Sequence, residues 1–93
     1  MEHSTGLVTL RYWASARAAA GVDSDLIEVT GLTSLADLQA RARELHQDSS
    51  RFSDVLRTCA VMVGDRPVTT SDPATVQVPP GATVEFLPPF AGG

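Results

Sequence analysis

Apolar and polar residues alternate in a run near the start of the chain. Within residues 7–13, Val8, Leu10 and Tyr12 share one side of an extended backbone. This two-residue period is typical of a half-buried strand. Trp13 falls on the opposite side of the same run. The pattern therefore predicts a first strand with one apolar face directed toward a core.

Three further runs have the composition of strands, and they cover residues 26–29, 59–63 and 83–87. The last run alternates as clearly as the first. In a layered fold of this kind the last strand usually lies inside the sheet, parallel to the first. We therefore expect Val84 and Phe86 to be core residues, and we expect the segment after this strand to leave from a rigid edge.

A helical period separates the second strand from the third. Ser34 can accept a hydrogen bond from the first free N–H groups, and Asp37 lies in the first turn, where the helix dipole favours a negative charge. Apolar residues then recur at helical spacing, at Leu35, Leu38, Ala42 and Leu45. Shorter helical turns are predicted within residues 14–20 and 52–56. One main helix across a mixed sheet predicts an α+β fold.

The length of 93 residues corresponds to a single small domain spanning residues 1–93. Residues 1–6 are expected to form a flexible N-terminus, and residues 88–93 an extended C-terminal tail. With 43% hydrophobic and 19% charged residues, the composition is that of an ordinary folded protein. A chain this short has little room for a deep pocket together with a bound cofactor and a set of catalytic side chains.

The net charge is −4, with seven arginines and no lysine, so a nucleic-acid partner is not expected. No apolar stretch approaches the roughly 20 residues that span a bilayer, so a membrane partner is not expected either. Residues 1–6 lack the basic and apolar regions of a signal peptide. A single cysteine, Cys59, suits a reducing environment. These features predict a cytoplasmic protein.

The candidate chemistry lies in the tail, which reads Leu87-Pro88-Pro89-Phe90-Ala91-Gly92-Gly93. A terminal α-carboxylate with a pKa of about 3.3–3.7 is ionised near neutral pH. Glycine has no Cβ, so the backbone can pass a narrow channel. The proline pair favours an extended stalk, which reduces the entropy lost when the tail enters a partner. We therefore expect the function to reside at Gly93.

With these features, the chain resembles the MoaD/ThiS family of ubiquitin-like sulfur carriers. The resemblance extends from Val8 to Gly93. It rests on three stretches, which are Tyr12-Trp13-Ala14-Ser15-Ala16-Arg17-Ala18-Ala19-Ala20-Gly21, Val61-Met62-Val63-Gly64-Asp65-Arg66-Pro67-Val68 and Val84-Glu85-Phe86-Leu87-Pro88-Pro89-Phe90-Ala91-Gly92-Gly93. The Pro-Pro-x-x-Gly-Gly ending is more similar to MoaD, the small subunit of molybdopterin synthase, than to ThiS. The resemblance implies a ubiquitin-like β-grasp fold.

The resemblance also implies a two-stage cycle. A ubiquitin-activating-type enzyme would use ATP to adenylate the Gly93 carboxylate, and a sulfur donor would then convert it to a thiocarboxylate. A MoaE-like large subunit of molybdopterin synthase would receive that sulfur. No cofactor bound to the chain itself, no metal and no catalytic side chain of its own are implied.

Gly93 and Gly92 are the predicted reacting end. The predicted partner-binding residues are Trp13, Arg17, Phe86, Leu87, Pro88, Pro89, Phe90 and Ala91. Trp13 fits an exposed partner contact and a packing role equally well, and a salt bridge or a turn cap is the simpler interpretation of Arg17. Cys59 is interpreted as a buried structural thiol, and His3 and His46 as solvated residues.

Other functions share the same sequence features. The sulfur could serve cysteine or thiamin biosynthesis, or a secondary metabolite, instead of molybdopterin. A different class is a ubiquitin-like protein modifier, whose Gly93 is joined to amines, or a plain interaction module.

Overall fold

The computed structural model describes residues 5–89. Its main sheet consists of β1 (Thr5–Tyr12), β2 (Ser24–Thr30), β4 (Ala60–Val63), β5 (Arg66–Pro67) and β7 (Thr83–Leu87). The helices are α1 (Ala14–Ala20), α2 (Leu35–Leu45) and α3 (Phe52–Thr58), with a 3₁₀ turn, η1 (Pro73–Thr75). Two short strands, β3 (Thr33–Ser34) and β6 (Gln77–Val78), pair with each other.

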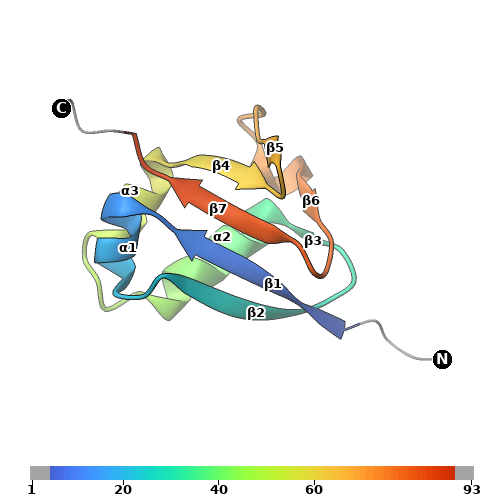
Figure 1. Ribbon diagram of the computed structural model, residues 1–93, viewed down its shortest axis with the longest axis horizontal. Coiled ribbons are helices and arrows are strands. Elements are labelled where there is room, and N and C mark those ends of the chain that lie inside the picture. The colour runs from blue at the N-terminus through green and yellow to red at the C-terminus, as the bar shows by residue number, and fades with distance from the viewer. Residues whose placement is uncertain (1–4, 90–93) are drawn as a thin grey trace.

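The strand order of the main sheet is β2-β1-β7-β4-β5. The last strand, β7, lies at its centre, parallel to β1 and antiparallel to β4. The sequence predicted this position, and the structure confirms it. Figure 1 shows α2 crossing behind β1 and β7, with the chain leaving β7 at one end of the sheet. The opposite face of these strands is turned toward the viewer and is free of any helix in the described part of the chain.

The core lies between this sheet and the helices. Val8, Leu10 and Tyr12 are buried, as the alternation predicted, and so are Val84 and Phe86. The other buried residues are Ala16, Ile27, Val29, Leu35, Leu38, Ala42, Phe52, Leu56, Val61 and Val78. Both predicted short helical segments are present, as α1 and α3, beside the predicted main helix α2.

Local signals define several element ends as predicted. The backbone N–H of Asp37 donates to the Ser34 hydroxyl at 3.0 Å, which caps the N-terminus of α2. Gly21 ends α1 in the left-handed region, at φ 80°, where a side chain would be strained. The first strand ends one residue earlier than expected, because Trp13 is the N-cap of α1. It also begins earlier, so Thr5 and Gly6 belong to β1 and not to a flexible N-terminus.

Two predictions were wrong because they considered one element at a time. Leu45 continues the helical spacing but is 56% exposed, since α2 ends there at the margin of the sheet. His46, which we expected to be solvated, has a side chain only 12% exposed. It packs against Phe52, with ring centroids 4.8 Å apart, and against the edge of Tyr12. The residue that follows the last turn of α2 is therefore part of the core boundary.

Candidate functional site

The tail begins at the end of the central strand of the sheet. β7 is held on both sides, by Tyr12↔Phe86 pairing to β1 and by Val61↔Phe86 pairing to β4. Pro88 is half-buried and Pro89 is exposed. The base of the tail thus follows directly from the central strand, which is paired on both sides. The predicted residues Phe90, Ala91, Gly92 and Gly93 lie outside the described residues.

Phe86 and Leu87 alternate across the sheet, and this separates their roles. Phe86 is fully buried and stacks on Tyr12, with centroids 5.8 Å apart. Its assignment to a partner-binding surface was therefore wrong for the side chain, which is a core element that holds β7 in place. Leu87 is half-buried and belongs to the opposite face, where a partner can reach it. The alternation of side chains along a strand was sufficient to predict that Phe86 and Leu87 lie on opposite faces.

The face of the sheet turned away from the helices, called the open face below, carries Leu87. Beside Leu87 it also carries a small polar and aromatic cluster. The indole N–H of Trp13 donates to the Glu85 carboxylate at 3.2 Å, and the Arg11 guanidinium lies 4.5 Å from the centre of the Trp13 ring. Arg11 and Glu85 are also direct neighbours across β1 and β7. Such cross-strand and cation–π contacts hold the indole in one orientation.

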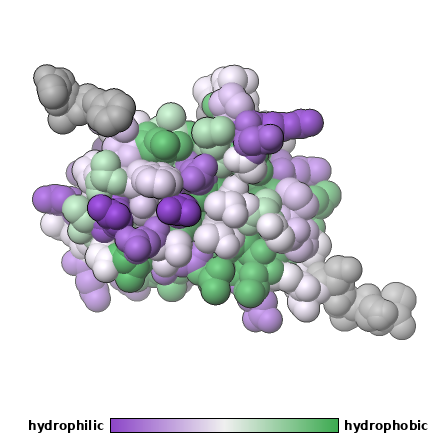
Figure 2. Space-filling model, viewed as in Figure 1, coloured by the Kyte–Doolittle hydropathy of each residue, from purple (hydrophilic) through white to green (hydrophobic). Residues whose placement is uncertain are grey.

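For Trp13 the sequence allowed an exposed partner contact or a packing role, and the structure combines the two. The side chain is half-buried against the sheet and is accessible beside the base of the tail. Figure 2 shows that the face around it is not a continuous apolar patch, because hydrophilic side chains gather over β1 and β7. The sequence placed Trp13 on this face, but Glu85 as its partner was missed, since the pairing depends on the register of β1 against β7.

Arg17 lies on α1, one turn after Trp13, and its backbone N–H donates to the Trp13 carbonyl at 3.3 Å. Its Nη1 is 3.6 Å from the Asp23 carboxylate, and the two side chains are 58% and 80% exposed. Its backbone carbonyl accepts the N–H of Gly21 at the end of α1. An ion pair this exposed contributes little to stability. The simpler interpretation of Arg17, a salt bridge beside a turn, therefore describes what the structure shows.

Cys59 is the C-cap residue of α3. Its Sγ donates to the carbonyl of Val55 at 3.3 Å. Burial raises the pKa of the thiol to about 11, so it is protonated near neutral pH. A thiol in this state is a poor nucleophile. These observations agree with the structural role expected for Cys59. No group of acidic, histidine and cysteine side chains in residues 5–89 has a metal-binding arrangement.

A second polar cluster, which sequence reasoning missed, joins α2 to the sheet. One carboxylate oxygen of Asp25 accepts the Tyr12 hydroxyl at 2.8 Å and lies 2.5 Å from Nε2 of His46. Burial, followed by the neighbouring carboxylate, raises the pKa of Tyr12 above its ordinary value. The ring of Tyr12 continues into the core, so the cluster is a structural clamp and not an open site.

The sequence model of the ThiS family matches residues 10–93. The match covers the end of β1, the other strands of the sheet, the three helices and the sequence of the tail. The chain belongs to the ThiS family. No curated protein sequence matches it. In the described part of this ThiS-family chain, no helix has both the length and the apolar character needed to cross a bilayer.

Solved structures with the same fold include several ThiS/MoaD-like proteins. SAMP1 from Haloferax volcanii superposes with a TM-score of 0.76 at 17% identity, over 95% of this chain and 100% of that one. Putative molybdopterin converting factor subunit 1 from Pyrococcus furiosus gives 0.71 at 23% identity, over 90% and 98%. A complex of subunits 1 and 2 of the Helicobacter pylori molybdopterin-converting factor gives 0.60 at 20% identity, over 94% and 99%.

These similarities, with the family match, confirm the family and the ubiquitin-like β-grasp fold that the sequence indicated. The fold is that of the ubiquitin-like sulfur carriers. At these identities each structural likeness concerns the fold alone. The open face beside Trp13 and Leu87, together with the base of the tail, is the candidate functional site of this family member.

Proposed function

We propose that this protein carries sulfur as a thiocarboxylate at Gly93. The observation that supports the proposal best is the ThiS-family match, which runs through the Gly-Gly sequence. The central position of β7 adds to it, because the strand before the tail is paired on both sides.

The proposed chemistry has two steps. A carboxylate oxygen of Gly93 attacks the α-phosphorus of ATP on an adenylating enzyme, forming an acyl-adenylate and releasing pyrophosphate. A sulfur donor then attacks the activated carbonyl and displaces AMP, which leaves the thiocarboxylate. The protonated thiol of Cys59 takes no part, and the adenylating enzyme supplies ATP and the catalytic groups.

The proposed sulfur acceptor site is in a molybdopterin synthase, with this chain as the small subunit. The Pro88-Pro89 sequence before the two glycines favours this pathway. One of the similar structures is itself a complex of the two molybdopterin-converting factor subunits. We propose that Trp13 and Leu87 contact the large subunit, with Pro88, Pro89, Phe90 and Ala91 entering its channel.

Intact-mass spectrometry tests the first step. The purified protein is incubated with a ThiS/MoaD-type adenylating enzyme, ATP, magnesium and sulfide. The expected product is heavier than the starting protein by the difference between sulfur and oxygen, and it requires ATP. A chain that lacks Gly93 is the matched control and should remain unchanged. A full-length chain that stays unmodified while a known carrier reacts in the same assay would overturn the proposal.

A second assay distinguishes the proposed sulfur carrier from a ubiquitin-like protein modifier. Some similar structures are named as modifiers, including the small archaeal modifier protein 1 of Haloferax volcanii, with a TM-score of 0.72 and 14% identity. The adenylated protein is mixed with a molybdopterin synthase large subunit and with cell extract. Binding to the large subunit and molybdopterin formation support the proposal, whereas amide-linked conjugates without molybdopterin formation would favour the modifier.

A further inference from the structure

The free edge of β2 is a second surface of this molecule. β2 is the terminal strand of the sheet, next to β1 and two strands away from β7. Neighbouring strands of an antiparallel pair exchange hydrogen bonds at every second residue. The N–H of Tyr12 donates to the carbonyl of Asp23 at 2.9 Å, so the odd-numbered residues of β2 face β1.

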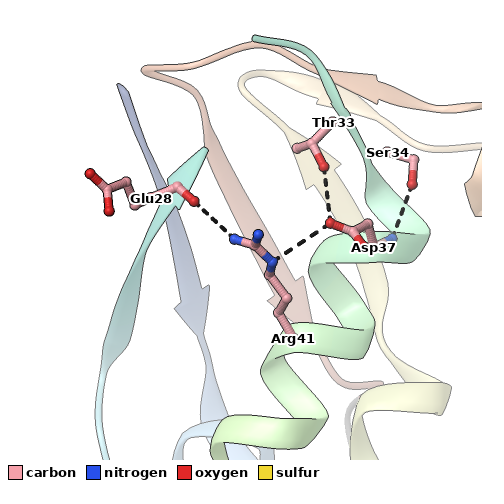
Figure 3. Close-up of polar contacts among 5 residues, drawn as sticks. All are labelled: Glu28, Thr33, Ser34, Asp37 and Arg41. Atoms are coloured by element: carbon pink, nitrogen blue, oxygen red, sulfur yellow. Dashed lines mark hydrogen bonds and ion pairs between the residues drawn. The ribbon is translucent and has the colours of Figure 1, made fainter. Parts of the chain in front are cut away.

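The even-numbered residues therefore direct their backbone groups away from the sheet. These residues are Ser24, Leu26, Glu28 and Thr30. Figure 3 shows the one partner that residues 5–89 provide for them, the Arg41 guanidinium, which donates to the carbonyl of Glu28 at 2.9 Å. The N–H and C=O of Leu26 remain available. A row of unpaired strand groups is the feature to which another strand can add.

Beside this edge lies a groove of about 380 Å³ between β2 and α2, lined by Leu26, Ile27, Glu28, Arg41, Glu44 and Leu45. Leu26 is 63% exposed on the face of β2 turned away from α2, and Leu45 is 56% exposed at the end of α2, so each side of the edge offers apolar surface. Figure 2 shows hydrophobic side chains gathered at this margin of the sheet, over β2. Backbone groups for pairing and side chains for selectivity are thus present together.

The charges of the groove indicate the kind of partner. Arg41 is already compensated, because Asp37 lies 3.7 Å away and Asp37 is held in turn by the hydroxyl of Thr33 (Figure 3). The carboxylates of Glu28 and Glu44 form no ion pair with any described residue. Glu44 lines the groove, whereas the Glu28 carboxylate points away from α2, on the other side of the same edge (Figure 3). The surplus charge around the edge is therefore negative, which favours a basic ligand.

We propose that the edge of β2 binds an extended segment of a partner protein, in which apolar and basic residues alternate, as an added sixth strand. The apolar residues of the added strand would lie over Leu26, on the face of the sheet turned away from α2. Its basic residues would lie on the α2 side of the edge, near Glu44. A second copy of this chain fits less well, because each copy carries a net charge of −4 and would bring its own acidic groove to the contact. The edge is separated from β7 by β1, so the tail stays free to react.

A peptide titration tests this proposal without any sulfur-transfer assay. The probe is a short peptide of alternating lysine and valine, and the readout is the backbone amide spectrum of the ¹⁵N-labelled protein. We expect saturable shifts at Leu26 and Glu28, with no shifts in β5 at the far edge. A glutamate–valine peptide tests the charge, and a lysine–valine peptide methylated on its backbone nitrogens tests strand pairing. Both should bind at least about tenfold more weakly.

Two protein variants locate the contact. Leu26→Pro removes an outward N–H without removing a bond to β1, and should weaken the lysine–valine peptide by about tenfold or more. Glu44→Gln should weaken it several-fold, whereas Asp65→Asn, an equal charge change in the turn between β4 and β5, should not. If Leu26→Pro fails to fold, the methylated peptide still decides the question of strand pairing.

Several results would overturn the proposal. One is equal binding of the lysine and glutamate peptides, and another is undiminished binding of the methylated peptide. Shifts confined to the open face beside Trp13 would place the contact elsewhere. A concentration-dependent dimer that is lost in Leu26→Pro would show that a second copy occupies the edge.

Discussion

At the scale of single residues, Phe86 and Leu87 show how one step along a strand changes a role. Phe86 is fully buried and stacked on Tyr12, whereas Leu87 lies on the open face. Phe86→Ala should lower the free energy of unfolding by about 3–5 kcal/mol, because it removes a buried ring and leaves a cavity. Chemical denaturation measures this loss. Leu87→Ala is the control and should cost less, and an equal cost for both would contradict the assignment.

The raised pKa of Cys59 predicts how the stability of the folded chain depends on pH. Burial raises the pKa of its thiol in the folded chain from 9.0 to about 11. Between these values the unfolded chain loses the proton and the folded chain keeps it, so stability should fall as pH rises through this window. Cys59→Ser should lessen that fall and should still accept sulfur at Gly93. Melting temperatures across the window and intact masses check both expectations. Loss of sulfur acceptance by a folded variant would show that Cys59 reacts.

At the scale of elements, polar contacts stabilise both ends of α2. At its N-terminus the Ser34 hydroxyl accepts the N–H of Asp37. Just beyond its C-terminus His46 contacts Asp25, which also accepts the Tyr12 hydroxyl. The second contact joins residues 21 positions apart and therefore depends on the packed fold.

This clamp predicts coupled losses of stability. Asp25→Asn and His46→Gln should each destabilise the protein by roughly 1–3 kcal/mol, because each leaves a partly buried polar group with a poorer partner. The double variant should lose less than the sum of the two, with an interaction energy of at least about 0.5 kcal/mol. Denaturation of all four proteins measures the cycle. Additive losses would show that the two side chains act independently.

At the scale of the whole molecule, the central strand β7 precedes the tail whose last residue, Gly93, is the proposed reacting end. Adding one residue after Gly93 should abolish sulfur acceptance and leave the melting temperature unchanged. The reason is that a displacement of about 1 Å at the reacting carbonyl can cost roughly a hundredfold in rate. The intact-mass assay and a thermal melt measure the two properties. Near-normal sulfur acceptance by the extended chain would contradict the proposed role of Gly93.

The partner interface gives a further prediction at this scale. Trp13→Ala should weaken binding to the large subunit more than added salt does, because a half-buried aromatic beside the tail provides apolar contact area. Phe90→Ala should act in the same direction. Leu7→Ala, an exposed residue elsewhere on β1, is the control and should have little effect. Calorimetric titrations at two salt concentrations measure these changes. A larger effect of salt would place the interface on a charged face.

The sequence by itself determined the features that depend on neighbours along the chain. The alternation around Leu10, the cap at Ser34 and the turn at Gly21 were all predicted, because each depends on the backbone and side chains of a few consecutive residues. The parallel central position of β7 was also predicted, from general rules of layered folds. The tail chemistry was implied by the resemblance to the MoaD/ThiS family and is a proposal.

Only the tertiary structure decided the features that join distant segments. The helical period included Leu45 in the core stripe, but the end of the sheet leaves it exposed. His46 was expected in solvent, yet Asp25 and Phe52 approach it from other elements. The bond from Trp13 to Glu85 spans 72 positions and needs the register of β1 against β7. Periodicity describes the faces of one element, whereas these outcomes depend on which other elements cover those faces.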